Sequence, residues 1–303
     1  MSDDPLWAII RSVPGWEHGE LEVAPLEGGI TNRNYVVSRG GDRFVLRVPG
    51  RDTELLGIDR ANEARAATLA AEAGVGPEVV AVLPDSGCFV ARFVEGAHVP
   101  MVDLRRDDVL GSVVRSLRAF HACAPIPSSF NVFRIVEGYG ETAEARGVAL
   151  PAAYAEAHAL ATRIEAGLAL NPAPLTTCHN DLLNANFLRE GDHTWIVDYE
   201  YAGMGDPFFD LGNLAVNNDL DSEADELLLW HAAGEVRDRH RARLALMRLM
   251  SDFREAMWGV VQQAISTLDE DFVAYAAKHF DRLLANAAAA PLSDLLTAAG
   301  EPT

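Results

Sequence analysis

Cysteine is scarce in this chain: Cys88, Cys123 and Cys178 are the only three among 303 residues. They are widely spaced, and no C-x-x-C pair occurs, so neither a disulfide framework nor a zinc site is expected. Thiols used this sparingly are typical of proteins in a reducing compartment. We therefore expect the protein to be cytoplasmic.

The sequence also lacks long apolar runs. No uninterrupted stretch is long enough to cross a bilayer, and the first residues, Met1-Ser2-Asp3-Asp4, lack the basic and apolar parts of a secretory signal. No repeat of 20 to 50 residues indicates a solenoid. We expect no membrane partner.

Positive charge is in short supply as well. Lys and Arg number 25 against 45 Asp and Glu, which gives a net charge of −20. Such a potential repels nucleic acid and anionic membranes and favours a cationic partner or substrate. The simpler explanation, that acidity maintains solubility, stays open. The sequence does not reveal the oligomeric state.

What is present is a dense polar stretch, Thr177–Leu188, followed by Thr194–Tyr201. Its pattern is H-x-D-x-x-x-x-N, then a turn, then an apolar run that ends in Asp198, and the expected order is loop, strand, turn, strand, acid. In phosphoryl transfer from ATP, one carboxylate orients the acceptor hydroxyl, while an Asn and a second Asp hold the Mg²⁺ that bridges the phosphates. These roles fall to Asp181, Asn186 and Asp198 respectively.

An alternative is that these residues only form turns, since Asp and Asn side chains often bond the nearby backbone. Asp198 argues against it, because it ends the run Trp195-Ile196-Val197 and a buried carboxylate requires a partner. Its oxygen atoms, with those of Asn186, are ligands that Mg²⁺ prefers.

A length of 303 residues exceeds the usual size of a single core, so two lobes are expected. The first part alternates as strands with one helix at about 59–73, and the pattern turns helical near residue 95. The predicted fold is therefore α+β and two-lobed, with a five-stranded antiparallel sheet and one helix at 1–95 and a larger, mainly helical lobe at 96–303. The predicted strands are 21–26, 34–38, 43–48, 78–83 and 88–94.

Arg47 lies in an otherwise apolar strand, and a buried Arg needs an anionic partner. Glu63 on the predicted helix is the candidate. A basic residue of a strand paired with an acidic residue of a helix resembles the ion pair that protein kinases place at the ATP phosphates. The alternative is an ordinary ion pair at the protein surface. ATP adenine is expected at the join of the lobes, at Phe93 and Val94.

Further helices are predicted in the second lobe, and a short one at residues 6–16 precedes the sheet. His121 is expected to be a capping or packing residue, and the basic run Arg237–Arg243 a solvated helix face. The predicted helices of the second lobe are 107–123, 152–169, one opening at Asp206-Pro207, 222–233, 236–266 and 270–288.

Together these motifs resemble the choline/ethanolamine kinase family, within the aminoglycoside-phosphotransferase-like small-molecule kinases, over about residues 27–284. An Arg at the strand-cation position is normal in that family. The D-F-G and A-P-E segments of protein kinases are missing, so protein-kinase activity is not expected. The resemblance is carried by Gly28-Gly29-Ile30-Thr31-Asn32, Phe44–Gly50, Asn62-Glu63, His179-Asn180-Asp181, Val197–Tyr201 and Asp210-Leu211-Gly212-Asn213.

The resemblance implies a protein-kinase-like fold, with ATP and Mg²⁺ as cofactors. It places the ATP phosphates beneath Gly29, Thr31 and Asn32, although Gly28-Gly29 is also a common turn pair. It implies an aromatic and acidic cage for an ammonium group, since a cation is attracted to ring faces. The implied acceptor residues are Glu200, Tyr201, Asp210, Trp258 and Tyr275, and the alternative for the aromatic ones is core packing.

Two positions depart from the family pattern. Asn217-Asn218 stand where an acid is frequent, and Glu255 corresponds to a second cage Trp of animal enzymes. Glu255 instead supplies charge suited to a smaller amine or a different amino alcohol. The expected function is phosphorylation of the hydroxyl of a small cationic alcohol, with choline or ethanolamine first. The alternatives are an aminoglycoside, thiamine or aminated-sugar kinase, and a catalytically silent nucleotide-binding protein.

Overall fold

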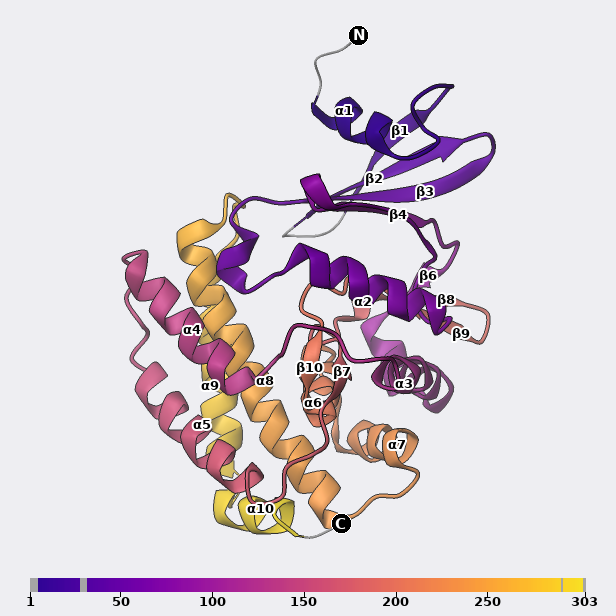
Figure 1. Cartoon of the computed structure of the whole chain (residues 1–303). Coiled ribbons are helices and arrows are strands. Elements are labelled where there is room, and N and C mark those ends of the chain that lie inside the picture. Colours follow the sequence, from indigo (N-terminus) through magenta and orange to yellow (C-terminus); the bar gives the residue numbers. More distant parts are fainter. Residues whose placement is uncertain (1–4, 28–31, 290, 302–303) are drawn as a thin grey trace.

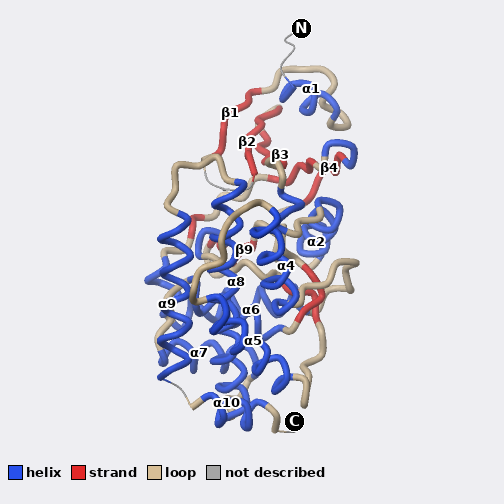
Figure 2. Tube along the Cα trace, turned by 90° about the vertical axis from the view of Figure 1, so that its left-hand side faces the viewer, coloured by secondary structure: helices blue, strands red, loops and turns tan. Residues whose placement is uncertain are grey.

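The computed structural model describes residues 5–27, 32–289 and 291–301. Two lobes are stacked, with the first sheet and the first helix at one end and most helices at the other (Figure 1). Figure 2 shows the same arrangement from the side, with β1 to β4 of the first sheet above and most helices below. The predicted two-lobed, protein-kinase-like α+β fold is confirmed.

The small lobe is built on an antiparallel five-stranded sheet of order β1-β2-β3-β5-β4. Its β2–β3 hairpin turns at Gly40-Gly41, whose φ values of 60° and 96° lie in the left-handed region that favours glycine. The predicted five strands are confirmed, and their bounds are β1 Glu22–Leu26, β2 Asn32–Arg39, β3 Asp42–Pro49, β4 Val79–Leu83 and β5 Cys88–Arg92.

Helix α1, Pro5–Ser12, covers one face of this sheet and is shorter than the predicted 6–16. Ile10 of this helix and Trp16, which lies after the helix, are buried in one cluster with Phe44. The Trp16 and Phe44 rings meet edge to face, with centroids 5.2 Å apart. Burial of these side chains is the main source of stability in a small sheet, at roughly 25 cal/mol per Å² of apolar area.

Two elements of the first hundred residues join the core of the larger lobe. Helix α2, Arg60–Glu72, begins at the cap residue Asp59 and packs its alanine-rich face, including Leu69, against that lobe. The short 3-10 helix η1, Thr53–Leu56, buries Leu56 in the same way. The Tyr139 hydroxyl donates to the Leu56 carbonyl at 3.2 Å.

The larger lobe is arranged around one long helix, α8, Asp238–Ile265. It contacts α4, α6, α9 and α10 and is buried over most of its length. The sequence prediction missed α4 and α10, whereas the others were expected within a few residues. The remaining helices are α3 Asp107–His121, α4 Val132–Ala145, α5 Tyr154–Leu168, α6 Pro207–Asn217, α7 Ser222–Ala233, α9 Phe272–Ala289 and α10 Leu292–Ala299.

Close packing of α6 on α8 depends on Gly212. A Cβ at this position would lie 2.6 Å from the backbone carbon of Met247. A side chain does not fit there. Glycine therefore lets the two helices approach each other more closely than any other residue would.

Short strands connect these helices to the polar stretch. Strand β7, Thr176–Cys178, pairs antiparallel with β10, Gly203–Gly205. The strands predicted after the H-x-D-x-x-x-x-N pattern are confirmed as β8, Phe187–Glu190, and β9, His193–Ile196, which pair with each other. Together with β6, Ala97–His98, they form a three-stranded sheet.

The prediction of a solvated face for the basic run on α8 is wrong for Arg243. Its side chain is buried, and it donates to the Asp206 carboxylate at 2.8 Å and to the Asn171 carbonyl at 2.9 Å. Arg243 thereby ties α8 to the residue that caps α6. Among the helices of the described residues, none is both long and apolar enough to cross a membrane.

Candidate active site

The loop that carries Asp181 follows β7, and the side chain of Asp210 on α6 stabilises it through hydrogen bonds. The Asp210 carboxylate accepts the backbone N–H groups of His179 at 2.9 Å and Asn180 at 2.6 Å, and it bonds the His121 ring at 2.8 Å. Asn180 has a φ of 67°, so this carboxylate stabilises a loop conformation that is costly for a non-glycine residue.

This arrangement corrects one prediction. Asp210 was expected among the acceptor residues, but it is completely buried and both of its oxygens are used by the protein. Burial alone would raise the pKa of Asp210, but hydrogen bonds from His121 and from backbone N–H groups, and nearby histidines, outweigh it and lower that pKa. His121 packs and bonds here as expected.

Asp181 follows Asn180 in this loop and lies at the base of the site, with 9% of its surface exposed. Its main chain is fixed on both sides, because Asn186 donates to its carbonyl at 2.8 Å and the next N–H, of Leu182, reaches Asn213 at 2.6 Å. Burial and the neighbouring acids raise the pKa of Asp181, and Arg254 opposes them. The carboxylate therefore has a fixed position and an increased affinity for a proton.

Asn186 and Asp198, the predicted metal ligands, are brought side by side by the β8–β9 hairpin. The N–H of Val197 donates to the Asn186 carbonyl at 3.0 Å. Asp198 follows with a φ of 70°, a left-handed conformation that is rare in a non-glycine residue and recurs at functional sites. The Asn186 amide nitrogen is used by Asp181, which leaves its oxygen as the ligand atom. Two hard oxygen donors at adjacent positions suit Mg²⁺.

Arg47 stands between the lobes and is surrounded by acids. It forms ion pairs with Glu63 and Asp198, and with Glu200 at 3.3 Å, so the predicted Arg47–Glu63 pair is confirmed. Arg60 adds a second cation, 2.7 Å from Glu63 and 3.4 Å from Glu200. Although burial opposes the charge, the three carboxylates raise the pKa of Arg47 and keep it ionised.

Glu200 therefore faces the small lobe. Its carboxylate accepts the amide of Asn32 at 2.7 Å, in addition to its contacts with the two arginines. Carboxylate oxygens of Glu63, Asp198 and Glu200 can lie within 4.8 Å of one another, a spacing that is also compatible with a cation. Glu200 thus lies on the side of the small lobe, beside Asn32 and Arg47, whereas it was predicted among the acceptor residues.

The other predicted nucleotide residues are less defined. The N–H of Phe93 continues the sheet by donating to the Arg43 carbonyl at 3.0 Å, and the Arg43 guanidinium lies 4.1 Å from the Phe93 ring centroid. Val94 follows in the connection to the larger lobe. Gly29 and Thr31 lie outside the described residues, so their phosphate role stays a prediction.

The predicted aromatic residues do meet. Trp258 donates its indole N–H to the Tyr201 hydroxyl at 3.1 Å, and its ring lies 5.6 Å from that of Tyr275. Tyr275 in turn donates to Glu255 at 2.7 Å. We call Tyr201, Arg254, Glu255, Trp258 and Tyr275 the acceptor cluster. Arg254 connects it to Asp181 through an ion pair of 3.2 Å.

Sequence reasoning missed Arg254, Arg60 and Asn213. Arg254-Glu255 is a charged pair between Phe253 and Ala256-Met257-Trp258 in the interior of a predicted helix. Two charges within an apolar helical segment were the available signal, because charged residues are rarely buried without a function or a partner.

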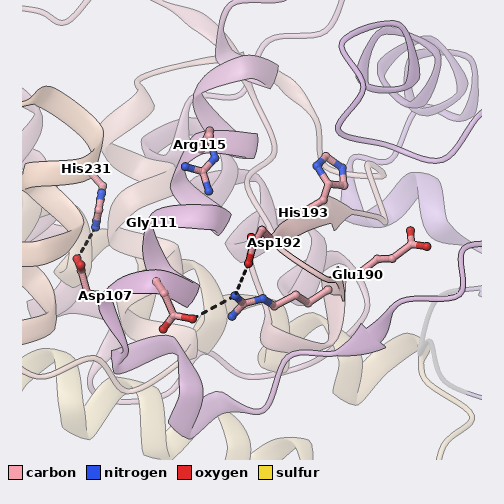
Figure 3. Close-up of a pocket in the computed structure, with 9 residues that line it drawn as sticks. Asp107, Gly111, Arg115, Glu190, Asp192, His193 and His231 are labelled. Carbon is pink, nitrogen blue, oxygen red and sulfur yellow. Dashed lines mark hydrogen bonds and ion pairs between the residues drawn. The ribbon is translucent and has the colours of Figure 1, made fainter.

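A pocket of about 790 Å³ lies elsewhere and shares no residue with this site. Figure 3 shows it between α3, α7 and the β8–β9 turn. Two ion pairs line it, Asp108 with Arg189 at 3.1 Å and Asp107 with His231 at 2.8 Å. These two acids are more than half exposed, unlike the buried carboxyl group of Asp181.

The phosphotransferase enzyme family matches residues 22–245 of the chain. A crystal structure of a choline/ethanolamine kinase family protein from Mesorhizobium loti is similar, with 35% identity, a TM-score of 0.83 and 99% of each chain covered.

Two named relatives are similar in sequence. Protein LicA of Haemophilus influenzae is 27% identical over 84% of this chain and 76% of the relative. Ethanolamine kinase 2 of Rattus norvegicus is 26% identical over 92% of this chain and 81% of the relative. The residues that match the phosphotransferase enzyme family, 22–245, include the loop of Asp181 and the ion pairs of Arg47.

Proposed function

Since the chain belongs to the phosphotransferase enzyme family, in its choline/ethanolamine kinase branch, and is a phosphotransferase acting on an alcohol, we propose that it transfers the γ-phosphoryl group of Mg²⁺-ATP to a small amino alcohol. Ethanolamine and choline are the first candidates. One observation carries the proposal: a single loop and hairpin present Asp181, Asn186 and Asp198 together, beside the acceptor cluster.

Asp181 is the residue that receives or orients the acceptor hydroxyl. It is held on a loop whose backbone is bonded to Asp210, Asn186 and Asn213, so its carboxylate needs no reorganisation when the acceptor arrives. A raised affinity for protons suits a group that takes a proton during transfer.

Asn186 and Asp198 would hold Mg²⁺, which supplies neutralisation of the charge on the transferring phosphate. Arg47, kept in place by Glu63, lies beside Asp198 and directs a fixed positive charge toward the nucleotide phosphates. Asn32, Gly29 and Thr31 would lie over the phosphates, and Phe93 and Val94 would contact the adenine. Most of the rate enhancement comes from positioning and electrostatics.

The acceptor cluster supports a cationic acceptor. Asp181 and Glu255 place two carboxyl groups around the single guanidinium of Arg254, and aromatic rings complete the surroundings. Burial opposes ionisation of Glu255, yet Arg254 and the Tyr275 hydroxyl lower its pKa and keep it charged. When Asp181 is ionised, the two carboxylates carry one negative charge more than Arg254 neutralises, and this charge beside aromatic side chains favours an ammonium group.

The test is ATP consumption by the purified protein with Mg²⁺ and a panel of acceptors: ethanolamine, choline, thiamine, an aminoglycoside and an aminated sugar. We expect ADP formation that depends on an amino alcohol, with the phosphate recovered on its hydroxyl. Turnover with only the aminoglycoside or the sugar would move the acceptor to another class. No turnover with any acceptor would indicate a nucleotide-binding protein without catalysis.

The location and partners of the protein follow the same proposal. The described thiols are free, and Cys88 and Cys178 are buried. Together with the small-molecule acceptor, this supports a cytoplasmic enzyme that acts without nucleic acid or a membrane.

A further inference from the structure

Arg254 occupies a position in the acceptor cluster that a ligand cation would otherwise take. It lies on α8 with 1% of its surface exposed, and its guanidinium carbon is 4.3 Å from the ring centroid of Tyr201. Its Nη1 donates to Asp181 at 3.2 Å and to Glu255 at 2.7 Å. The protein thus supplies its own cation over one aromatic face, a position that favours positive charge.

The remaining aromatic surface is largely committed to the protein. Trp258 stands nearly perpendicular to Phe272 and Tyr275, with centroid distances of 5.8 and 5.6 Å, and its N–H points to the Tyr201 hydroxyl. Edge-to-face packing of this kind uses ring faces and edges for internal contacts. Few faces are left to surround a bulky cation.

Hydrogen-bond acceptors, in contrast, are plentiful and fixed. Glu255 Oε2 accepts from Tyr275 at 2.7 Å, and its Oε1 accepts from Arg254 and from the amides of Asn213 and Asn217 at 3.4 and 3.5 Å. Asp181 adds a second carboxylate. Each carboxylate oxygen can accept more than one hydrogen bond, so a donor-rich ligand finds partners here.

Arg254 also has unused donors. Its Nε and Nη2 are buried and have no hydrogen-bond partner within the part of the chain that the structure describes. Such groups cost free energy until an oxygen atom lies beside them. Two such nitrogen atoms on the guanidinium that bonds Asp181 mark Arg254 as a residue that faces an oxygen-bearing ligand, such as the acceptor alcohol.

From these contacts we infer that Arg254 determines acceptor specificity, favouring a primary ammonium over a quaternary one. A primary ammonium has three N–H donors and is held by carboxylates and hydroxyls, whereas a trimethylammonium has none and depends on ring faces. Arg254 occupies one such face, while the carboxyl groups of Asp181 and Glu255 lie beside it as hydrogen-bond acceptors. This inference rests on the proposed function and names the substrate class of that site.

The first experiment needs no variant. It measures kcat/KM at saturating Mg²⁺-ATP for ethanolamine, N-methylethanolamine, N,N-dimethylethanolamine and choline. We expect a decrease along this series, with ethanolamine at least about tenfold better than choline, because a site built to bond N–H groups rejects analogues that lack them. Choline equal to or better than ethanolamine would overturn the inference and leave the proposed function intact.

The second experiment replaces the arginine. Arg254→Met frees the ring face of Tyr201, and we expect the ethanolamine-to-choline ratio of kcat/KM to fall at least about fivefold. Arg254→Lys keeps the charge without the planar fork, and we expect an intermediate ratio. The matched control is Arg248→Met, also on α8 and also paired with an acid, Asp225, but outside the site; its ratio should equal that of the unaltered protein.

An unchanged ratio in both Arg254 variants would overturn the inference. If Arg254→Met fails to fold, as judged by its thermal transition, Arg254→Lys and the methylation series still decide. Absence of turnover with all four acceptors would contradict the proposed function itself, a result distinct from a reversed preference.

Discussion

Arg47 on β3 and Asp198 in the larger lobe form an ion pair across the two lobes, 151 residues apart in the sequence. The same guanidinium holds Glu63 of α2 and Glu200. The proposed phosphate-binding cation and the proposed metal ligand are therefore held next to each other by ion pairs within the protein. Preorganised charges of this kind need little rearrangement during phosphoryl transfer.

Arg47→Met removes the partner of three acids at once. We expect the KM for ATP to rise at least about tenfold and the free energy of unfolding to fall by about 3–5 kcal/mol, because Asp198 loses its ion pair with Arg47 and the buried Glu63 and Glu200 keep only Arg60 as a counter-charge. Steady-state kinetics and urea unfolding measure the two effects. Arg92→Met is the control, since this exposed residue of the same sheet pairs with Glu78 at the surface and should change stability by less than about 1 kcal/mol.

Asp181→Asn keeps the shape of the side chain and removes its capacity to accept a proton. We expect kcat to fall by about 10²–10⁴-fold, while the dissociation constant for ATP changes little. Isothermal titration with ATP measures the dissociation constant, and a single-turnover assay measures the rate of phosphoryl transfer. Asp103→Asn, at a half-exposed position outside the site, serves as the control. A variant that turns over at the normal rate would remove Asp181 from the catalytic role.

Asp198→Asn tests the metal site. We expect the Mg²⁺ concentration for half-maximal activity to rise at least about tenfold, since a carboxylate binds the cation far better than an amide. Asp192→Asn, on the nearby β8–β9 turn and fully exposed, should leave that concentration unchanged. Chelation of Mg²⁺ should stop turnover in all variants. An equal Mg²⁺ requirement in Asp198→Asn would contradict the assignment.

Gly212→Ala tests the packing of α6 on α8. The added Cβ meets backbone atoms of Met247 that cannot rotate away, so we expect a loss of about 1–3 kcal/mol in the free energy of unfolding. Gly138→Ala, in α4 with open space around the added Cβ, is the matched control. There we expect no loss, and a gain of up to about 1 kcal/mol from helix propensity. Urea unfolding measures both.

Stability should decrease in mild acid because of His179. Burial lowers the pKa of His179, against the opposing influence of Asp210. The unfolded state then binds the proton more readily, so the free energy of unfolding falls as pH falls through about 6.5, the ordinary value. Urea unfolding at several pH values measures the decrease, which should be smaller in His179→Asn. An NMR titration that placed the His179 pKa at or above its ordinary value would contradict the expectation.

Much of the fold follows from local patterns. Strands β4 and β5 alternate in burial, turn residues separate the strands of the sheet, and the hairpin before Asp198 follows a clear strand, turn, strand pattern. Helix α4 escaped prediction because Gly138 and Gly140 weaken its helical signal, although Asn131 caps it. Strands β7 and β10 have three residues each, too few for any periodicity.

The site was predictable where one segment carries it. Asp181, Asn186 and Asp198 lie on one loop and hairpin, so their spacing predicted their proximity. The structural task of Asp210 depends on bonds to residues about thirty positions away. Arg254 meets Asp181 across 73 positions, and its place over Tyr201 depends on how α8 packs against the loop. Such relations come from tertiary packing, which local periodicity does not contain.

The segment that carries Leu56 joins the two lobes at a second place, apart from the connection at Phe93 and Val94. Leu56 and Ile58 are buried in the core of the larger lobe, and Tyr139 bonds the Leu56 carbonyl. Helix α2, which follows Leu56 in the chain, packs into the larger lobe as well, so the sheet cannot move far from that lobe without breaking these contacts. Any displacement that exposed Leu56 would cost the free energy of its burial, which ties the separation of the lobes to a single apolar side chain far from the carboxylates.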